Sequence, residues 1–397
     1  MSDAFLSLYE KERLLLKNEG TFSQRISSPR KKKLLLMIII GFISLIPIFC
    51  FKNSLERSLS QDPLTQASRV ERTIFNQYDC KYGVAMGADT KNTQGILALI
   101  HSIIFNYRPS HDGDNLCLFV FTTRDDHEDR KQSIECAQES MTRLGRNSAN
   151  VKIIYRVIDK ANWVPRIHGK HEEDVPGMEY KWFRYYLTPD DVDGLTRVLY
   201  LDTDMIIEGN LVELFEWNMN GHVVAASSYG EPLRNHLCHN HKLSDIAMKT
   251  NKIGIFGKKT VTPFETPSHI DTGLLLIDLE KKKKQSILNK WSTLLDLHEF
   301  DECLWLEEYS GEADFTLAIR GDIEQIPDEW NMGNLGTPEK YRVAGGCKGA
   351  KAMHWNGNAK PYTSEGRTSA LCPEYFDRYD IVPILLKENP ECYSFQY

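Results

Sequence analysis

The sequence lacks several features that would place it in a common class of proteins. It has no excess of positive charge, because its 397 residues give a formal net charge of -7. A protein that binds nucleic acid usually presents a basic surface, so this balance argues against a nucleic-acid partner. No Cys-x-x-Cys pair occurs, which argues against a zinc ribbon, and no internal repeat is evident. There is also no Asn-x-Ser/Thr sequon, so glycan attachment gives no information about the compartment.

The chain does contain one long hydrophobic run, the uncharged residues 34–51. At about 1.5 Å per residue, a helix of this length spans roughly 27 Å, close to the hydrocarbon core of a bilayer. The basic residues 30–33 precede the run, and such residues mark the cytoplasmic side of a membrane span. No small-residue cleavage site follows, which argues against a cleaved signal peptide. The sequence therefore predicts a signal anchor in type II topology, with a buried core helix as the alternative.

This prediction divides the chain into four regions. A cytoplasmic tail covers residues 1–33, the transmembrane anchor 34–51, a polar stem 52–79, and a large lumenal domain 80–397. Eight cysteines follow the anchor, and an even number fits disulfide bonds in an oxidising lumen. Their pairing cannot be deduced from the sequence, and Cys117 also fits an ordinary buried strand cysteine.

Apolar strands alternate with helical patterns from about residue 81 onward. The predicted strands lie within residues 82–89, 116–123, 151–157, 197–204 and 273–279. The predicted helices lie within residues 96–104, 130–145 and 179–187 and around 287–295. This alternation predicts an α/β fold with a mostly parallel central sheet and helices on both faces. The four lysines at 281–284, at the start of the last helix, are predicted to form a solvated face, and residues 229–267 an insertion or long loop.

Two carboxylates follow the fourth predicted strand, in the sequence Tyr200-Leu201-Asp202-Thr203-Asp204. Because alternate residues of a strand share a face, Asp202 and Asp204 are expected to converge at the carboxyl edge of the sheet, where ligands bind. Paired carboxylates repel one another, and a partly open site of oxygen ligands suits Mg²⁺ or Mn²⁺ completed by substrate phosphates. The alternative is a capping or turn pair ahead of a helix at residues 211–215.

The segment at 354–362, His-Trp-Asn-Gly-Asn-Ala-Lys-Pro-Tyr, is the second candidate for chemistry. His354 is a candidate metal ligand, although a lone histidine is more often a satisfied interior or surface residue. Gly357 permits a turn in which the backbone approaches a phosphate, and Lys360 supplies a cation that can meet one. Their combination favours a phosphate-binding segment.

Several segments resemble glycosyltransferase family 8, which includes glycogenin, galactinol synthases and plant galacturonosyltransferases. The segments VLYLDTDMIIEGNLVELF, HIDTGLLLIDL, DEWNMGNLG and HWNGNAKPY occur in the family's order, and the resemblance covers about residues 82–365. It is specific at the Asp-x-Asp strand and at the last segment and looser between them. The resemblance implies a GT-A-type nucleotide-sugar-binding fold, a donor that is usually UDP-linked, Mn²⁺ as the cofactor, and retention of anomeric configuration.

The resemblance also implies residue roles. The implied metal ligands are Asp202, Asp204 and His354; the implied donor-binding residues are Asp89, Arg184, Asp202, Thr203, Asp204, Gly357 and Lys360; and the implied catalytic residues are Asp314, Arg184 and Lys360. Lys360 is expected to meet the donor diphosphate, and Asp89 the nucleotide base. Arg184, inside an aromatic run, is expected near the donor, with an ordinary Arg–Asp pair or a cation–π contact as the alternative.

The chain departs from the family pattern at two places. Asp271-Thr272-Gly273 stands where the family often has Asn-x-Gly, and Glu312-Ala313-Asp314 stands where it often has Asp-Gln-Asp. Alanine therefore stands at the position of the family's glutamine. Asp314 is expected to orient the acceptor or to stabilise an oxocarbenium-like transition state.

These patterns predict a single-pass glycosyltransferase of the Golgi or endoplasmic reticulum membrane, with residues 80–397 as its catalytic domain. Its expected partners are a nucleotide-sugar donor and a glycan, protein or small-molecule acceptor. One alternative is a non-catalytic lumenal sugar-binding or partner protein on the same fold. Another is a phosphotransferase of the haloacid dehalogenase type, which also places Asp-x-Asp after a strand but gives the segment at 354–362 no role.

Overall fold

The computed structural model describes most of the chain beyond the predicted stem. The described residues are 79–88, 92–143, 149–158, 178–232, 235, 237–238, 268–300, 304, 312–319, 322–337 and 347–388. They all belong to one compact unit, residues 74–397. The predicted tail, anchor and stem lie outside the described residues, as do Asp89 and most of the predicted insertion at 229–267. Among the described helices, none is long and apolar enough to cross a membrane.

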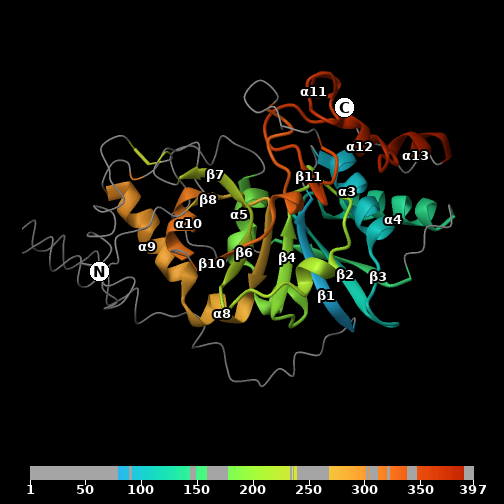
Figure 1. The fold of residues 1–397 in the computed structure, drawn as a ribbon. Helices are drawn as coiled ribbons and strands as arrows, with labels where there is room; N and C mark the ends of the chain where they lie inside the picture. Colours follow the sequence, from blue (N-terminus) through green and yellow to red (C-terminus); the bar gives the residue numbers. More distant parts are fainter. Residues whose placement is uncertain are drawn as a thin grey trace, which may run out of the picture. The chain divides into compact units, whose positions relative to one another are not determined.

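A central sheet organises this unit, with the strand order β10-β6-β9-β4-β1-β2-β3 (Figure 1). Its strands are β1 (Cys80–Gly87), β2 (Asn115–Thr122), β3 (Val151–Val157), β4 (Arg197–Leu201), β6 (Val224–Ala226), β9 (Leu274–Asp278) and β10 (Ile323–Gln325). Strand β1 runs parallel to β2 and β4, β2 parallel to β3, and β10 parallel to β6. Strand β9 runs antiparallel between β4 and β6. The sheet is therefore mostly parallel, as predicted, with one reversed strand.

Two small sheets complete the strands. One pairs β5 (Met205–Ile207) with β11 (Ala352–His354), and the other pairs β7 (Ser228–Pro232) with β8 (Ser268–Ile270). The α-helices are α3 (Thr93–Asn106), α4 (His127–Arg143), α5 (Met178–Tyr186), α6 (Val212–Phe215), α8 (Leu279–Lys284), α9 (Ile287–Phe300), α10 (Ala313–Ile319), α11 (Ser364–Arg367), α12 (Pro373–Asp377) and α13 (Val382–Glu388). Short 3-10 helices cover Pro189–Val192 and Asp328–Trp330.

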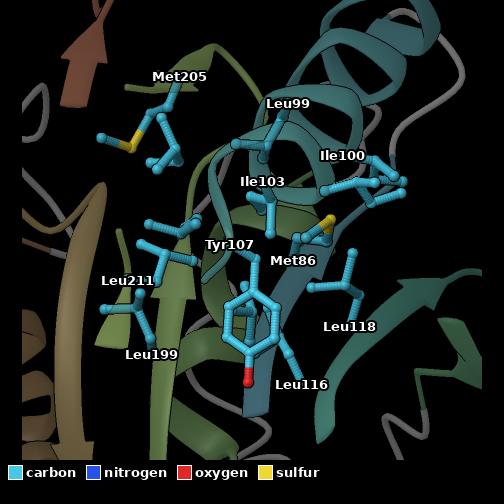
Figure 2. Packing of buried hydrophobic residues seen from close by; sticks show 14 of the residues in the cluster. Met86, Leu99, Ile100, Ile103, Tyr107, Leu116, Leu118, Leu199, Met205 and Leu211 are labelled. Carbon is cyan, nitrogen blue, oxygen red and sulfur yellow. The ribbon is translucent and has the colours of Figure 1, made fainter. Parts of the chain in front are cut away.

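Helices cover both faces of the sheet, because successive strand residues point to opposite sides. Val84 and Met86 of β1 join a core with α3 and α4, whereas Ala85 joins a core with α5, α9 and α10. Figure 2 shows Leu99 and Ile103 of α3 packed beside Met86 and other strand residues. Burying one such side chain contributes about 1.5–3 kcal/mol. This packing holds helix α3 against the strands, including β4, which leads into the Asp-x-Asp motif.

The predicted solvated face at residues 281–284 is wrong for one lysine. Lys282 is only 3% exposed, and its Nζ donates a hydrogen bond of 2.7 Å to the carbonyl oxygen of Leu187. Burial lowers the pKa of Lys282 to about 7, although Asp191 acts in the opposite direction. The four lysines lie in α8, a short helix separate from α9, and successive helical residues turn by about 100°. One of four consecutive side chains must therefore face the core.

Disulfide bonds tie together parts of this unit. Cys80 at the start of β1 pairs with Cys117 in β2, so the interpretation of Cys117 as an ordinary strand cysteine is wrong. Cys347 pairs with Cys372, which closes a chain segment that contains β11 and its continuation. Cys136 and Cys238 are also disulfide-bonded.

Candidate metal centre

The two carboxylates of the Asp-x-Asp motif lie in a turn beyond the end of a strand. Strand β4 ends at Leu201, and β5 begins at Met205, so Asp202 and Asp204 flank Thr203 between the two strands. Asp202 is anchored by its backbone N–H, which donates to the carbonyl oxygen of Gly273 at 2.8 Å. The carboxylates do converge, but the turn brings them together rather than the alternation of a strand.

Of the alternative roles for this pair, the capping role is wrong, whereas the turn is present. Helix α6 begins at Val212 with Leu211 as its N-cap, and β5 lies between this helix and the carboxylates.

Strand β11 brings His354 to these carboxylates across about 150 residues of sequence. In the antiparallel β5–β11 pair, His354 stands opposite Met205, the residue that follows Asp204. Its Nε2 lies 3.3 Å from Oδ1 of Asp204 and 4.0 Å from Oδ2 of Asp202. One ligand atom from each of the three residues lies within 4.8 Å of the others. The pairing register thus assembles three potential ligands at the end of the sheet.

This donor set fits a divalent cation. Two carboxylates and one imidazole suit Mn²⁺ and related ions, and the predicted ligands are close enough to share one ion after small side-chain rotations. Gly273 leaves the space that this requires, because a Cβ atom there would lie 2.9 Å from Nε2 of His354 and 3.0 Å from Oδ2 of Asp202. A side chain at this position would displace His354 or Asp202.

Two cations balance the carboxylates. Nη2 of Arg184 lies 3.1 Å from Oδ1 of Asp202, and Nη1 donates to the carbonyl oxygen of Thr272 at 2.7 Å. The guanidinium also stands 4.5 Å from the ring centroid of Tyr200. Arg184 therefore makes both contacts that the sequence left as alternatives, the Arg–Asp pair and the cation–π contact, and it also lines a recess at the site.

Lys360 forms an ion pair with Oδ2 of Asp204 and donates to the carbonyl oxygen of Trp355 at 2.6 Å. Its ammonium group is thus held beside the Asp-x-Asp turn.

The charges of these groups shift one another's pKa. Burial would raise the pKa of Asp204, but Lys360 and His354 hold it well below its ordinary value. Burial would lower the pKa of His354, but Asp271 and Asp204 raise it well above its ordinary value. Burial would likewise lower the pKa of Arg184, but the nearby carboxylate of Asp202 raises that pKa by more. Asp204, His354 and Arg184 are therefore charged at neutral pH when no metal ion is bound.

A recess of about 190 Å³ opens beside the cluster. Its lining includes Arg184, Asp202, Thr203, Asp204 and Lys360, together with Gly87, Asn92, Tyr180, Tyr200 and Tyr362. The last five have no predicted site role. Two of them carried a signal: Tyr180 is one helical turn before Arg184, and Tyr362 ends the segment that carries Lys360. The hydroxyl of Tyr362 donates to Oδ1 of Asn92 at 3.1 Å and so joins this segment to the start of α3.

A second recess, of about 210 Å³, lies on the other side of His354. Its lining residues are Ser227, Ser228, Asp271, Asp328, Asn331, Met332, Gly333 and Asn334. Asp271 and Asn331 also face Nδ1 of His354, through oxygen atoms at 3.2 and 3.1 Å. No role was predicted for Asn331, although it belongs to the family-like segment DEWNMGNLG.

The remaining predicted residues lie apart from this cluster. Gly357 has φ of +104° and packs against Gly336, where a Cβ atom would lie 2.8 Å from the carbonyl oxygen of Gly336. Asp314 is fully buried in the first turn of α10, and its Oδ1 accepts a hydrogen bond from the N–H of Phe315 at 2.8 Å. Neither lines a recess described above. Their predicted contacts with donor and acceptor stay predictions.

Comparisons with known proteins agree with this arrangement. Residues 83–366 match the family described as Glycosyl transferase family 8. "Probable galacturonosyltransferase-like 10" of Arabidopsis thaliana is 25% identical over 184 residues, which cover 45% of this chain and 47% of that protein. "Glycosyltransferase 8 domain-containing protein 1" of Xenopus laevis is 26% identical over 302 residues, which cover 72% of this chain and 74% of that protein.

The chain spans about half the length of some of its relatives, including 47% and 49% of two galacturonosyltransferase-like proteins. Among solved structures, the apo form of the bifunctional glycosyltransferase WbbM superimposes with a TM-score of 0.53 at 14% identity, over 81% of this chain and 52% of that one.

The mostly parallel sheet and the Asp-x-Asp turn at its edge define the GT-A class of glycosyltransferase folds. Within that class the chain belongs to glycosyl transferase family 8, whose match covers residues 83–366. The haloacid dehalogenase alternative is therefore wrong.

Proposed function

We propose that this protein transfers a sugar from a UDP-linked donor to a hydroxyl of a glycan, protein or small-molecule acceptor. The reaction requires a divalent cation, for which we propose Mn²⁺, and retains the anomeric configuration. The observation that carries the proposal is the convergence of Asp202, Asp204 and His354, with one ligand atom from each within 4.8 Å of the others. Lys360 lies against the same turn, where the donor diphosphate would meet it.

The residues have separable roles in this proposal. Asp202, Asp204 and His354 would hold the cation, which when bound supplies Lewis-acid stabilisation of the departing diphosphate. Arg184 keeps the carboxylate of Asp202 turned toward the site through their ion pair. Lys360 exchanges its contact with Asp204 for one with the diphosphate, where negative charge grows as the sugar–phosphate bond breaks.

The two recesses suggest where the substrates bind. The recess beside Lys360 and Tyr362 would take the donor, since it contains both cations of the site. The recess beyond His354 is lined by hydroxyl, amide and carboxylate groups, which suit a sugar or another hydroxyl-bearing acceptor. No nucleophile is identified among the described residues, so retention by attack from the leaving-group face and retention through a covalent intermediate both remain open.

We further propose that the protein is a type II membrane protein with its catalytic unit in the lumen of the Golgi or the endoplasmic reticulum. The uncharged run at 34–51 and the preceding basic residues support the anchor. The disulfide bonds Cys80–Cys117 and Cys347–Cys372 support the compartment, since such bonds persist in oxidising environments.

A donor screen of the purified full chain tests the activity. UDP-linked glucose, galactose, xylose, glucuronate and galacturonate are offered with Mn²⁺, with and without chelator, and free UDP is measured. Galacturonate belongs in the panel because the Arabidopsis relative is named for its transfer. We expect metal-dependent release of UDP from at least one donor, even by slow hydrolysis without an acceptor. UDP binding without release from any donor would favour the non-catalytic alternative.

A further inference from the structure

Asp271 stands on the opposite edge of the His354 ring from the proposed metal ligands. Its Oδ2 lies 3.2 Å from Nδ1 of His354, whereas Nε2 of the same ring faces Asp204. A second oxygen, Oδ1 of Asn331, approaches Nδ1 at 3.1 Å. Because two acceptor oxygens face Nδ1, this nitrogen keeps its proton when a metal ion displaces the proton on Nε2.

The carboxylate of Asp271 is itself held on several sides. Its side chain is 4% exposed, and its Oδ1 accepts the N–H of Gly273 at 2.8 Å. Its own backbone N–H donates to the carbonyl oxygen of Ser227 at 3.1 Å. Asp271 lies between β8 and β9, which belong to two different sheets, so both ends of its short segment are held by strands.

We propose that Asp271 is a positioning residue for the metal centre: it fixes the tautomer and the plane of the His354 ring and so directs Nε2 at the ion. This inference rests on the proposed metal site. A carboxylate bonded to the distal nitrogen of a histidine ligand also makes that ligand more basic. A neutral amide at this position would accept a weaker hydrogen bond than the carboxylate does.

The test compares Asp271→Asn with the matched change Asp328→Asn. Both replace a carboxylate with an amide of the same shape in the same recess, but only Asp271 contacts His354 among their described contacts. Mn²⁺ affinity is measured by calorimetry on the full chain without nucleotide. We expect Asp271→Asn to weaken Mn²⁺ binding by about 10- to 100-fold, as for other outer partners of metal ligands. Asp328→Asn should leave the affinity unchanged.

A second variant moves the carboxylate without removing its charge. A Cβ atom at Gly333 would lie 3.2 Å from Oδ2 of Asp271, so Gly333→Ala should push the carboxylate by a few tenths of an ångström. We expect a smaller but measurable loss of Mn²⁺ affinity. In a donor assay, turnover of Asp271→Asn should recover at high Mn²⁺, because the defect lies in metal binding. Thermal unfolding without metal should change little, which separates this role from a structural one.

The outcomes are distinct. Wild-type Mn²⁺ affinity in Asp271→Asn would overturn the proposal, and lost turnover at saturating Mn²⁺ would then indicate a direct contact with a substrate. Equal weakening by Asp328→Asn would also overturn it, since charge alone would explain the effect. If the wild type binds Mn²⁺ but releases no UDP from any donor, the proposed function fails while the role of Asp271 is still decided by calorimetry. If the wild type binds no divalent cation, both the proposed function and the proposed role of Asp271 are wrong.

Discussion

Gly273 and His354 come from segments 81 residues apart, yet a Cβ atom on Gly273 would lie only 2.9 Å from Nε2 of His354. The same atom would lie 3.0 Å from Oδ2 of Asp202. Only glycine therefore fits between the proposed metal ligands. Gly273 directly precedes β9. Its carbonyl oxygen also accepts a hydrogen bond from the backbone N–H of Asp202.

We expect Gly273→Ala to abolish detectable Mn²⁺ binding while the protein remains folded. The added methyl group must displace His354 or Asp202, and overpacking of this kind costs about 1–3 kcal/mol. Calorimetry with Mn²⁺ and thermal unfolding without metal measure the two effects. Normal Mn²⁺ affinity in the variant would show that the ion is held elsewhere.

The His354→Ala and Lys360→Ala variants should respond differently to metal. Lys360→Ala should lower kcat by about 10²-fold or more, since it removes a contact that strengthens as the leaving group forms. His354→Ala removes a ligand, so high Mn²⁺ should restore part of its activity, whereas Lys360→Ala should not recover. Turnover across a Mn²⁺ titration makes the comparison. Wild-type turnover in both folded variants would show that residues 354–362 form only a structural turn.

The disulfide Cys347–Cys372 should matter more for donor binding than Cys80–Cys117. It closes the segment that carries His354 and Lys360, whereas Cys80–Cys117 joins β1 to β2. Replacing either pair with serine should cost about 2–5 kcal/mol of stability. Only loss of Cys347–Cys372 should also weaken UDP binding in Mn²⁺, by about tenfold or more, because small misplacements of binding groups are costly. Equal UDP affinity in both double variants would contradict this.

Lys282 should make the stability of the protein depend on pH. Its pKa falls from 10.5 in the unfolded chain to about 7 in the fold, so between these values the unfolded state binds more protons. The contribution of Lys282 to the free energy of unfolding should therefore increase as the pH rises from about 7 to about 10.5. Lys282→Met should remove that rise and stabilise the protein most at and below about pH 7, where the buried lysine is charged. Lys283→Met, at an exposed position of the same helix, serves as the control. Parallel stability curves for the two variants would refute the assignment.

The proposed topology can be tested with fluorescent fusions in cells whose plasma membrane alone is permeabilised. The basic residues 30–33 precede the apolar run, so an N-terminal fusion should be digested by added protease and a C-terminal fusion protected. The reverse pattern would overturn both the topology and the compartment.

Local sequence patterns predicted most of the sheet and its helices. The apolar run that forms β2 and the periodic residues of α3 are buried as expected, because period and burial are tied to each other in strands and helices, whereas only Val151 and Ile154 of β3 are buried. The same patterns say nothing about direction. The run that forms β9 has the composition of a parallel strand, yet β9 pairs antiparallel with β4. Direction depends on where the preceding chain enters the sheet.

The sequence by itself determined which residue types are present for chemistry: two carboxylates after a strand, and a histidine and a lysine six residues apart. Only the tertiary structure decided that they meet. The β5–β11 register sets His354 beside Asp204, a turn rather than a strand makes Asp202 and Asp204 converge, and Gly273 leaves room between them. It also placed Asp271 behind His354. A local pattern records periodicity and propensity, whereas such contacts depend on strand pairing between residues far apart in the chain.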